Sequence, residues 1–291
     1  MSDLTKALIE GAQGWGADLV GIAPIERFKD VAAENHPSTI FPECKSVIVL
    51  GRRITRGTLR GIEEGTQFDL YRQYGYQWLE DRFLSLLTFK VSELLEDNRW
   101  EAVPLFHLPT QIPPMGIPVR ENQPAPNVLI DFDAAAVRAG LGEISYLRVF
   151  VSKEFGPRQR FQVILTDAEL EGTEMVKEPI CPADPRLAGL CPLDAIDASK
   201  EEVIEIAGKK MTVAAVDYKK CKTCKNGAFA NRYYDAAPPD RLGALCTRSL
   251  VDYLDKHDHT TNKFKTPFRK RTPWIIKSES HTFLQEGSEI E

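Results

Sequence analysis

Long apolar runs are missing from this sequence. No stretch of its 291 residues is apolar for long enough to cross a bilayer, so no transmembrane helix is expected. The first residues contain neither a charged segment followed by an apolar run nor a twin-arginine pair, so no export signal is expected. We therefore expect a cytoplasmic protein, in which clustered cysteines bind metals more often than they form disulfides.

An excess of positive charge is also missing. The chain has 37 Lys and Arg against 42 Asp and Glu, and this net charge of -5 argues against a general nucleic-acid binder. Residues 263–271 interleave cations with aromatics, a pattern that could contact a tRNA backbone. In an acidic protein we expect this segment to be a solvated tail, so tRNA is an unfavoured partner that the sequence leaves open.

Hydrophobic periodicity predicts helices interleaved with strands. Helices are expected at 4–15, 78–95 and 131–141. Strands are expected at 18–22, 46–50, 148–152 and 161–165, and Phe155-Gly156-Pro157 should join the last two as a hairpin. A hairpin among helices favours an α+β sandwich over a doubly wound parallel sheet. Residues 55–65 should form a mobile loop, and the proline-rich segment 104–126 an irregular one.

The predicted strands stop after Asp167. We therefore expect a core domain over residues 1–174 and a small second domain over 175–291. The second domain should contain short helices, five of the six cysteines and the basic tail.

Two cysteines are absent from what would otherwise be a ferredoxin motif. In the pattern C-x2-C-x2-C-x3-C-P, Cys191-Pro192 matches the end and Cys181 the start. Asp184 and Leu187 occupy the two middle positions. The cysteines therefore suffice for at most one four-thiolate cluster.

The remaining cysteines define a candidate ligand set. In two-cluster ferredoxins the fourth cysteine of one motif completes the other cluster, which would bring Cys191 to Cys221 and Cys224. We predict one 4Fe-4S cluster on these three residues and Cys246, with Cys181 as the rival for the last place. A structural zinc in the same thiolates and an empty site with the cysteines packed as core remain open alternatives. Cys44, which precedes a predicted strand, should pack in the core.

Several segments in chain order resemble the superfamily of epoxyqueuosine reductases and reductive dehalogenases. These are corrinoid-binding iron–sulfur reductases with a nitroreductase-like core. The most specific segment is Arg138-Ala-Gly-Leu-Gly-Glu143, followed by Glu154-Phe-Gly-Pro-Arg158 and Leu165-Thr-Asp167. Residues 41–50 and 71–76 are similar to further segments of the same pattern. The resemblance covers about residues 1–200, and its spacing is closer to the dehalogenase branch.

The resemblance implies a nitroreductase-like α/β/α sandwich followed by a degenerate ferredoxin-like domain. It also implies a corrinoid (cobalamin), or a flavin in the same kind of fold, on the core sheet. The residues implied to contact this cofactor are Gly140, Gly142, Glu143, Gly156, Arg158 and Arg160. Glycines let backbone approach a flat ligand, and arginines bind its oxygens. The ordinary interpretation is glycines that end a helix and arginines on a solvated turn.

A reductase of this kind needs a proton donor. The resemblance implies an aspartate before the Ala-Gly-Leu-Gly segment or a tyrosine after it, which makes Asp133 and Tyr146 the candidates. The ordinary interpretation makes Asp131 a helix N-cap and Asp133 a first-turn acid. His107 could be an axial or substrate ligand, although a lone histidine is more often structural.

Together these features predict an iron–sulfur oxidoreductase. Electrons from a donor protein would pass through a single cluster to a corrinoid or flavin and then to a small organic substrate. The alternatives are a non-catalytic corrinoid-binding or processing protein with a structural or empty cysteine site, and a zinc-stabilised scaffold. The sequence favours a monomer slightly.

Overall fold

The centre of the molecule is a four-stranded antiparallel sheet. The computed structural model describes residues 2–276 and 283–284. The strand order is β1-β2-β6-β3. The strands are β1 (Leu19–Pro24), β2 (Ser46–Arg53), β3 (Ala102–Leu105) and β6 (Gln159–Thr166).

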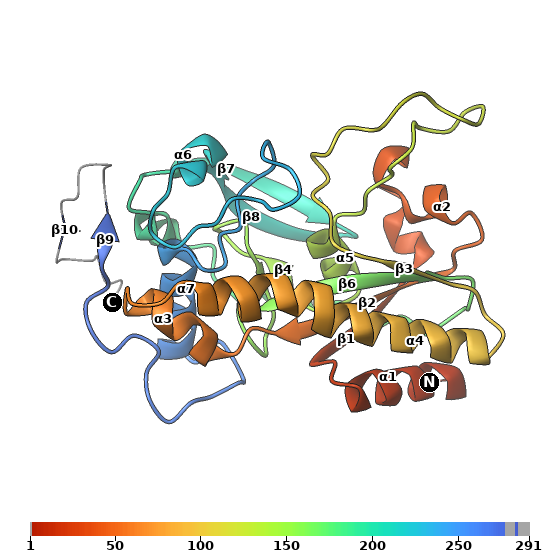
Figure 1. Ribbon diagram of the computed structural model, residues 1–291, viewed down its shortest axis with the longest axis horizontal. Helices are drawn as coiled ribbons and strands as arrows, with labels where there is room; N and C mark the ends of the chain where they lie inside the picture. The colour runs from red at the N-terminus through yellow and green to blue at the C-terminus, as the bar shows by residue number, and fades with distance from the viewer. Residues whose placement is uncertain (1, 277–282, 285–291) are drawn as a thin grey trace.

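Helices cover both faces of this sheet (Figure 1). Side chains alternate between the two faces of a strand, so an uninterrupted apolar strand such as β2 must be covered twice. Ile48 and Leu50 pack in one hydrophobic cluster with α1 (Asp3–Gly14) and α4 (Ser85–Asp97). On the other face of the sheet, Val47 packs with α5 (Phe132–Arg138) in a second hydrophobic cluster. The predicted mixed α+β fold with helices on a sheet is therefore confirmed.

The three predicted helices are present, and one is longer than expected. In α1 the Ser2 side chain accepts a hydrogen bond from the backbone N–H of Thr5 at 3.3 Å, as an N-cap does. Two π-helical stretches, Tyr71–Gln77 and Leu79–Leu84, lead directly into α4. Such stretches are frequent at functional sites, and these two carry residues of the candidate site described below.

The predicted hairpin between 148–152 and 161–165 is wrong. The strand β5 (Phe150–Val151) pairs with β4 (Glu143–Ile144), whereas β6 lies between β2 and β3. A turn does form, closed by a bridge between Ser152 and Gly156, but it leads the chain into the central sheet. The physical reason is burial: both faces of β6 are covered by protein, so the strand belongs in the middle of the sheet.

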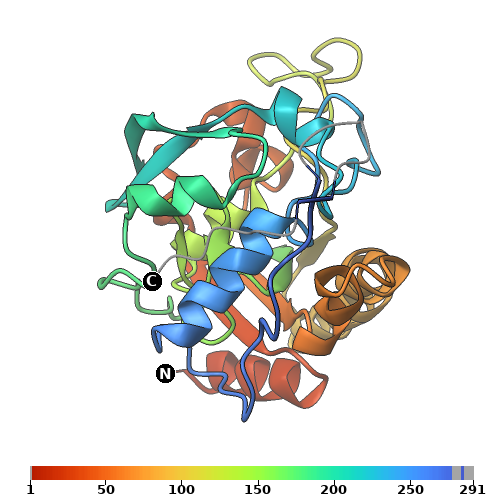
Figure 2. The ribbon, with the colours of Figure 1, turned by 90° about the vertical axis from the view of Figure 1, so that its left-hand side faces the viewer.

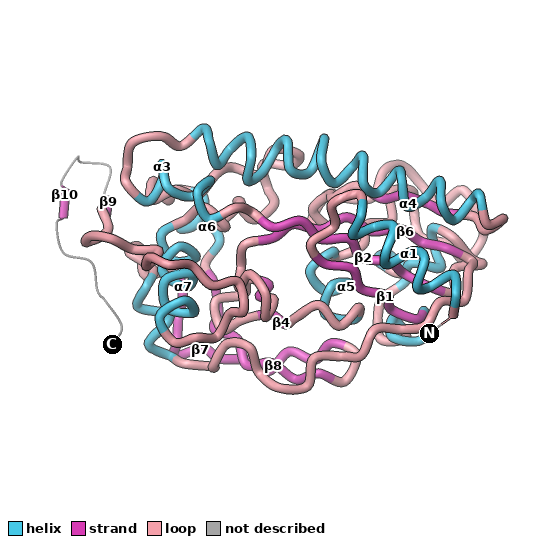
Figure 3. Tube along the Cα trace, turned by 90° about the horizontal axis from the view of Figure 1, so that it is seen from below, coloured by secondary structure: helices cyan, strands magenta, loops and turns pink. Residues whose placement is uncertain are grey.

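The predicted end of strand structure after Asp167 is also wrong. The strands β7 (Ile196–Ile206) and β8 (Lys209–Val216) form an antiparallel hairpin. Its two-residue turn, Ala207-Gly208, has φ values of 48° and 86°, as the favoured hairpin turns require. Figure 3 shows the hairpin on the side of the sheet opposite α4. The exposed face of β7 carries Glu and Lys, which strands usually lack. These residues hid the alternation of apolar and polar residues that would have predicted a strand.

The segment predicted as a mobile loop is packed instead, and the segment predicted as a solvated tail is buried at two residues and exposed at the others. The segment 55–65 forms a helical turn and α3 (Arg60–Glu63), and Ile62 is fully buried. In the basic segment 263–271, Phe268 is fully buried and the Arg269 side chain pairs with Glu63 at 2.8 Å. A buried carboxylate thus recruits a cation from a segment that resembles a solvated tail.

The remaining α-helix of the N-terminal half is α2 (Pro37–Ile40). The C-terminal half adds α6 (Tyr218–Lys222), α7 (Leu245–Lys256), β9 (Ile275–Ile276) and β10 (Phe283–Leu284). A third hydrophobic cluster joins Leu147 and Val151 to Leu250 and Leu254 of α7. Figure 2 shows α7 as the blue helix that faces the viewer. The division at residue 174 stays a prediction, and most of the chain after 276 lies outside the described residues. No helix in the described part of the chain combines the length and apolar character needed to span a membrane.

Candidate functional site

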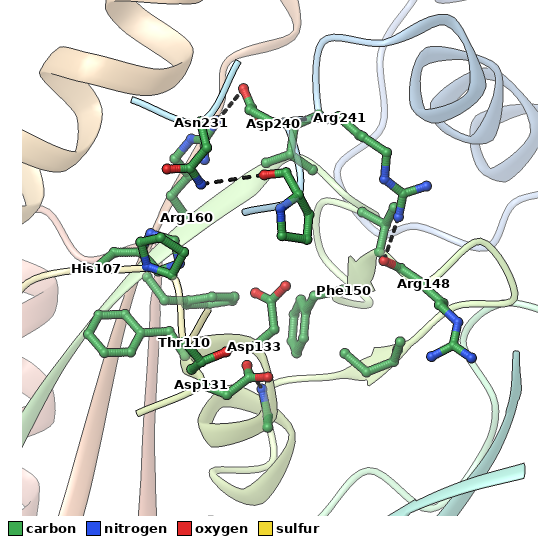
Figure 4. Close-up of a pocket in the computed structure, with 18 of the residues that line it drawn as sticks. His107, Thr110, Asp131, Asp133, Arg148, Phe150, Arg160, Asn231, Asp240 and Arg241 are labelled. Atoms are coloured by element: carbon green, nitrogen blue, oxygen red, sulfur yellow. Dashed lines mark hydrogen bonds and ion pairs between the residues drawn. The ribbon is translucent and has the colours of Figure 1, made fainter. Parts of the chain in front are cut away.

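A cavity of about 410 Å³ opens between the central sheet and the C-terminal half (Figure 4). Its volume is in the range of small-molecule sites. The start of α5, the first residues of β6 and the end of the β7 strand contribute to its walls. The segment 238–242, just before α7, closes another side.

Asp133 in the first turn of α5 projects into this cavity (Figure 4). Asp131 is the N-cap of the helix, and its carboxylate accepts a hydrogen bond from the Ala134 N–H at 2.9 Å. The Asp133 side chain is open to the cavity but surrounded by protein. This desolvation, reinforced by the charge of Asp131, raises the pKa of Asp133 to about 7. Asp133 can therefore hold and release a proton near neutral pH.

Arg160 forms the charged wall of the cavity. From β6, it donates to the carbonyl of Gly75 at 2.6 Å and to a Glu80 carboxylate oxygen at 3.0 Å. It also pairs with Asp240 at 2.9 Å and donates to the Tyr71 hydroxyl, which in turn donates to Asp240 at 2.6 Å. Burial alone would favour the neutral guanidine, but Asp240 and its other partners raise the pKa of Arg160 well above its ordinary value. This wall is fixed and stays charged.

His107 is the cavity residue with an unused ring nitrogen. Its Nδ1 is buried and has no hydrogen-bond partner among the described residues, and its ring meets Phe132 edge-on at 5.4 Å. Burial lowers the pKa of His107 to about 4, so the ring is neutral at pH 7. The predicted ligand role for His107 stays a prediction, and its position in the cavity wall is compatible with that role.

Four of the five clustered cysteines meet in a second, smaller cavity of about 10 Å³. Cys191 ends the short helix Pro185–Leu190, and Cys221 lies in α6. Cys224 follows α6, and Cys246 lies in the first turn of α7. We call this site the thiol pocket. It contains the four cysteines of the predicted ligand set.

The donors in the thiol pocket suit an iron–sulfur cluster. The Ala195 N–H donates to Cys191 Sγ at 3.3 Å, and Asn226 Nδ2 donates to Cys224 Sγ at 3.9 Å. Hydrogen bonds to sulfur are one of the means by which proteins tune such clusters. Burial raises the pKa of Cys221 to about 12, so this thiol becomes a thiolate only with a compensating positive charge, such as that of a metal.

Four thiolates are also a ligand set for a structural zinc. Within the described residues, no group of three or more Cys, His, Asp or Glu is placed to hold one metal ion. The cluster and the zinc alternative therefore both stay predictions.

Cys181 does not line the thiol pocket. It is buried beside Glu143, whose carboxylate accepts hydrogen bonds from the N–H groups of Ile180 and Cys181 at 2.9 Å each. Glu143 also pairs with Lys209 at 3.1 Å, which links this loop to β8. The structure therefore gives both residues packing contacts, and their predicted ligand roles stay predictions.

Most of the residues implied to bind a cofactor lie outside the large cavity. The Gly140 backbone approaches the carbonyl of Glu174, and Gly142 approaches that of Val151. Neither glycine lines the cavity.

The remaining predicted residues face protein as well. Gly156 packs near Leu254, and Arg158 donates to the carbonyl of Ile54 at 2.8 Å. The Tyr146 hydroxyl donates to Glu201 at 2.6 Å. Of all the predicted cofactor, ligand and proton-donor residues, Asp133, Arg160 and His107 line the cavity.

Arg241, which the sequence did not single out, lines both cavities. Its Nη2 donates to the carbonyls of Leu147 at 2.9 Å and Arg148 at 2.8 Å. Its Nη1 is buried and has no hydrogen-bond partner in the described part of the chain. The sequence signal that could have found it is a charged pair, Asp240-Arg241, directly after Pro238-Pro239 and before a helix.

No family model and no curated protein sequence matches this chain. Among solved structures, it is similar to a reductive dehalogenase described with a mechanism for B12-dependent dehalogenation. The TM-score is 0.53 and the identity 19%, over 74% of this chain and 28% of that one. The catabolic reductive dehalogenase NpRdhA gives 0.55 and 15%, over 89% and 38%. An epoxyqueuosine reductase from Bacillus subtilis gives 0.46 and 15%, over 92% and 65%.

These similarities define the class of fold. The chain shares the fold of reductive dehalogenases, and the predicted resemblance is confirmed at the level of structure. The chain spans between 28% and 38% of the length of those dehalogenases. Their activity and cofactors are therefore carried over only as proposals.

Proposed function

We propose that this protein is an iron–sulfur oxidoreductase that reduces a small organic molecule in the large cavity. When bound, a 4Fe-4S cluster on Cys191, Cys221, Cys224 and Cys246 would supply single electrons, and a corrinoid or flavin would pass them to the substrate. The observation that carries this proposal is the shared wall: Arg241 lines both the thiol pocket and the cavity. A separate electron-donor protein would deliver the electrons.

The walls of the large cavity support an organic guest. Phe150, Ile204 and Ile206 supply apolar surface, while Arg160 and His107 supply polar atoms. The unpartnered Nδ1 of His107 gives a guest a hydrogen-bonding group. A flat ring system suits such mixed walls.

The proposed proton donor is Asp133. It lines the cavity with a pKa of about 7, so near neutral pH a large fraction carries a transferable proton. The Tyr146 hydroxyl is bound to Glu201 and does not line the cavity. Substrate reduction should therefore depend on Asp133, and the Asp133→Asn variant should bind the guest but reduce it slowly.

Iron analysis tests the proposal directly. Protein purified without oxygen should contain about four iron atoms per chain and show a broad brown absorption that dithionite bleaches. Cys224→Ser should lose most of this iron. The matched control is Cys44→Ser, because Cys44 is also buried but its thiol donates to the Ser46 carbonyl, away from the pocket. Equal iron in the two variants would remove Cys224 from the ligand set.

One observation favours a second candidate function. The thiol pocket has a volume of only about 10 Å³, as expected for cysteines packed as core. On this view the protein binds or processes a corrinoid without catalysing a reduction. Anaerobic protein that contains a corrinoid, with its sharp red bands, but no iron would support this candidate.

A further inference from the structure

Arg241 places a buried positive charge between the thiol pocket and the large cavity. Its side chain is 7% exposed, and Figure 4 shows it running away from the centre of the cavity. The two hydrogen bonds from Nη2 to backbone carbonyls fix the orientation of the guanidinium. The charge is therefore held in one place and shielded from water.

The other arm of this guanidinium has no acceptor. Nη1 is buried without a partner among the described residues, and an unsatisfied buried donor is destabilising. Apart from the cysteines, the side chains that share the thiol pocket with Arg241 are apolar: Pro192, Leu193, Ala195, Ala228, Ala244 and Leu245. Sulfur is therefore the side-chain acceptor that this pocket offers.

We propose that Arg241 donates a hydrogen bond from Nη1 to the sulfur of a cluster in the thiol pocket and raises the reduction potential of that cluster. The inference rests on the proposed function. A positive charge favours whichever state of a neighbouring centre has one more electron, and a buried charge acts far more strongly than one in water. Arg241 is thus a positioning residue that makes the cluster easier to reduce.

Potentiometric titration followed by EPR tests this inference. At a fixed applied potential, Arg241→Gln should lower the ratio of reduced to oxidised cluster about tenfold, which for one electron is about 59 mV. Arg241→Lys, which keeps the charge, should retain most of the wild-type potential. The control is Lys225→Gln, the same loss of charge at an exposed residue next to Cys224, and it should change the ratio less than about twofold.

The outcomes are distinguishable. A wild-type protein without iron would overturn the proposed function and this inference together. A cluster whose potential is the same in wild type and Arg241→Gln would overturn the inference alone. A purely structural role of Arg241 would reduce iron retention in both variants without shifting the potential of the cluster that remains.

A second measurement decides the matter if Arg241→Gln fails to hold a cluster. In wild-type protein labelled with ¹⁵N-arginine, pulsed EPR of the reduced cluster should detect a ¹⁵N coupling. Arg241 is the arginine that lines the thiol pocket within the described residues. Because Arg248 also lies near Cys246, the coupling is assigned to Arg241 only if labelled Arg241→Lys protein lacks it. Absence of this coupling would overturn the inference.

Discussion

Replacing Asp133 with Asn should stabilise the protein in a pH-dependent way. The pKa of Asp133 rises from an ordinary 3.8 to about 7 in the folded state, because the cavity desolvates the carboxylate. The folded state therefore binds a proton more tightly than the unfolded chain does. Below the pKa of the unfolded chain, Asp133 is protonated in both states and does not lower the free energy of unfolding. As the pH rises through the folded pKa, the free energy of unfolding of the wild type falls.

The magnitude follows from this difference in pKa. A difference of about 3 corresponds to an upper limit of roughly 4 kcal/mol, at about 1.36 kcal/mol for each tenfold change. The carboxylate still faces cavity water, which screens it, so we expect about half of this limit, ~2 kcal/mol. Asp133→Asn should thus be more stable than wild type by ~2 kcal/mol near pH 8 and nearly equal to it near pH 4.

Urea unfolding at the two pH values measures the effect. The matched control is Asp131→Asn, since Asn caps a helix as well as Asp does and Asp131 is exposed. The control should show only a small part of the gain, through relief of its repulsion of Asp133. A gain that is the same at both pH values, or a less stable Asp133→Asn variant near pH 8, would refute the reasoning.

Two further predictions concern the core and the cysteines. Glu63→Gln removes a carboxylate that pairs with two buried arginines and should lower the free energy of unfolding by about 3–5 kcal/mol in urea. Glu64→Gln, whose carboxylate pairs with the more exposed Arg60 and Arg271, should cost less than about 1 kcal/mol, and equal losses would contradict the assigned burial. Cys246→Ser should lose iron while Cys181→Ser keeps it; iron analysis that reverses this order would exchange the two residues in the ligand set.

Local pattern allowed the elements of the core to be predicted, but not their pairing. The apolar run at 46–50 predicted a strand because both faces of β2 are covered. The neighbours of β6 depend on contacts with residues about a hundred positions away, which periodicity cannot show. The β7 strand was missed because Glu201 and Glu202 face solvent and only its last residues face the cavity.

The candidate site shows the same limit. Asp133 could be proposed from the family resemblance, and the four cysteines of the thiol pocket from the analogy with two-cluster ferredoxins. Spacing alone could not separate Cys181 from Cys246, since their positions depend on how α7 packs. Arg241 was missed because a charged residue in a proline-rich loop is usually solvated, and only the folded structure shows its burial.

The β7–β8 hairpin forms one wall of the cavity and can change in sequence without disturbing the central sheet. Its two strands bond to each other and belong to a sheet of their own, so sequence drift there leaves the register of the central sheet untouched. Ile204 and Ile206 are the positions where such drift would reshape the guest's surroundings. Proteins that share this fold could therefore differ in the guest they bind through changes in the β7–β8 hairpin alone. A library of variants at these two positions would test whether the guest changes while the central sheet stays intact.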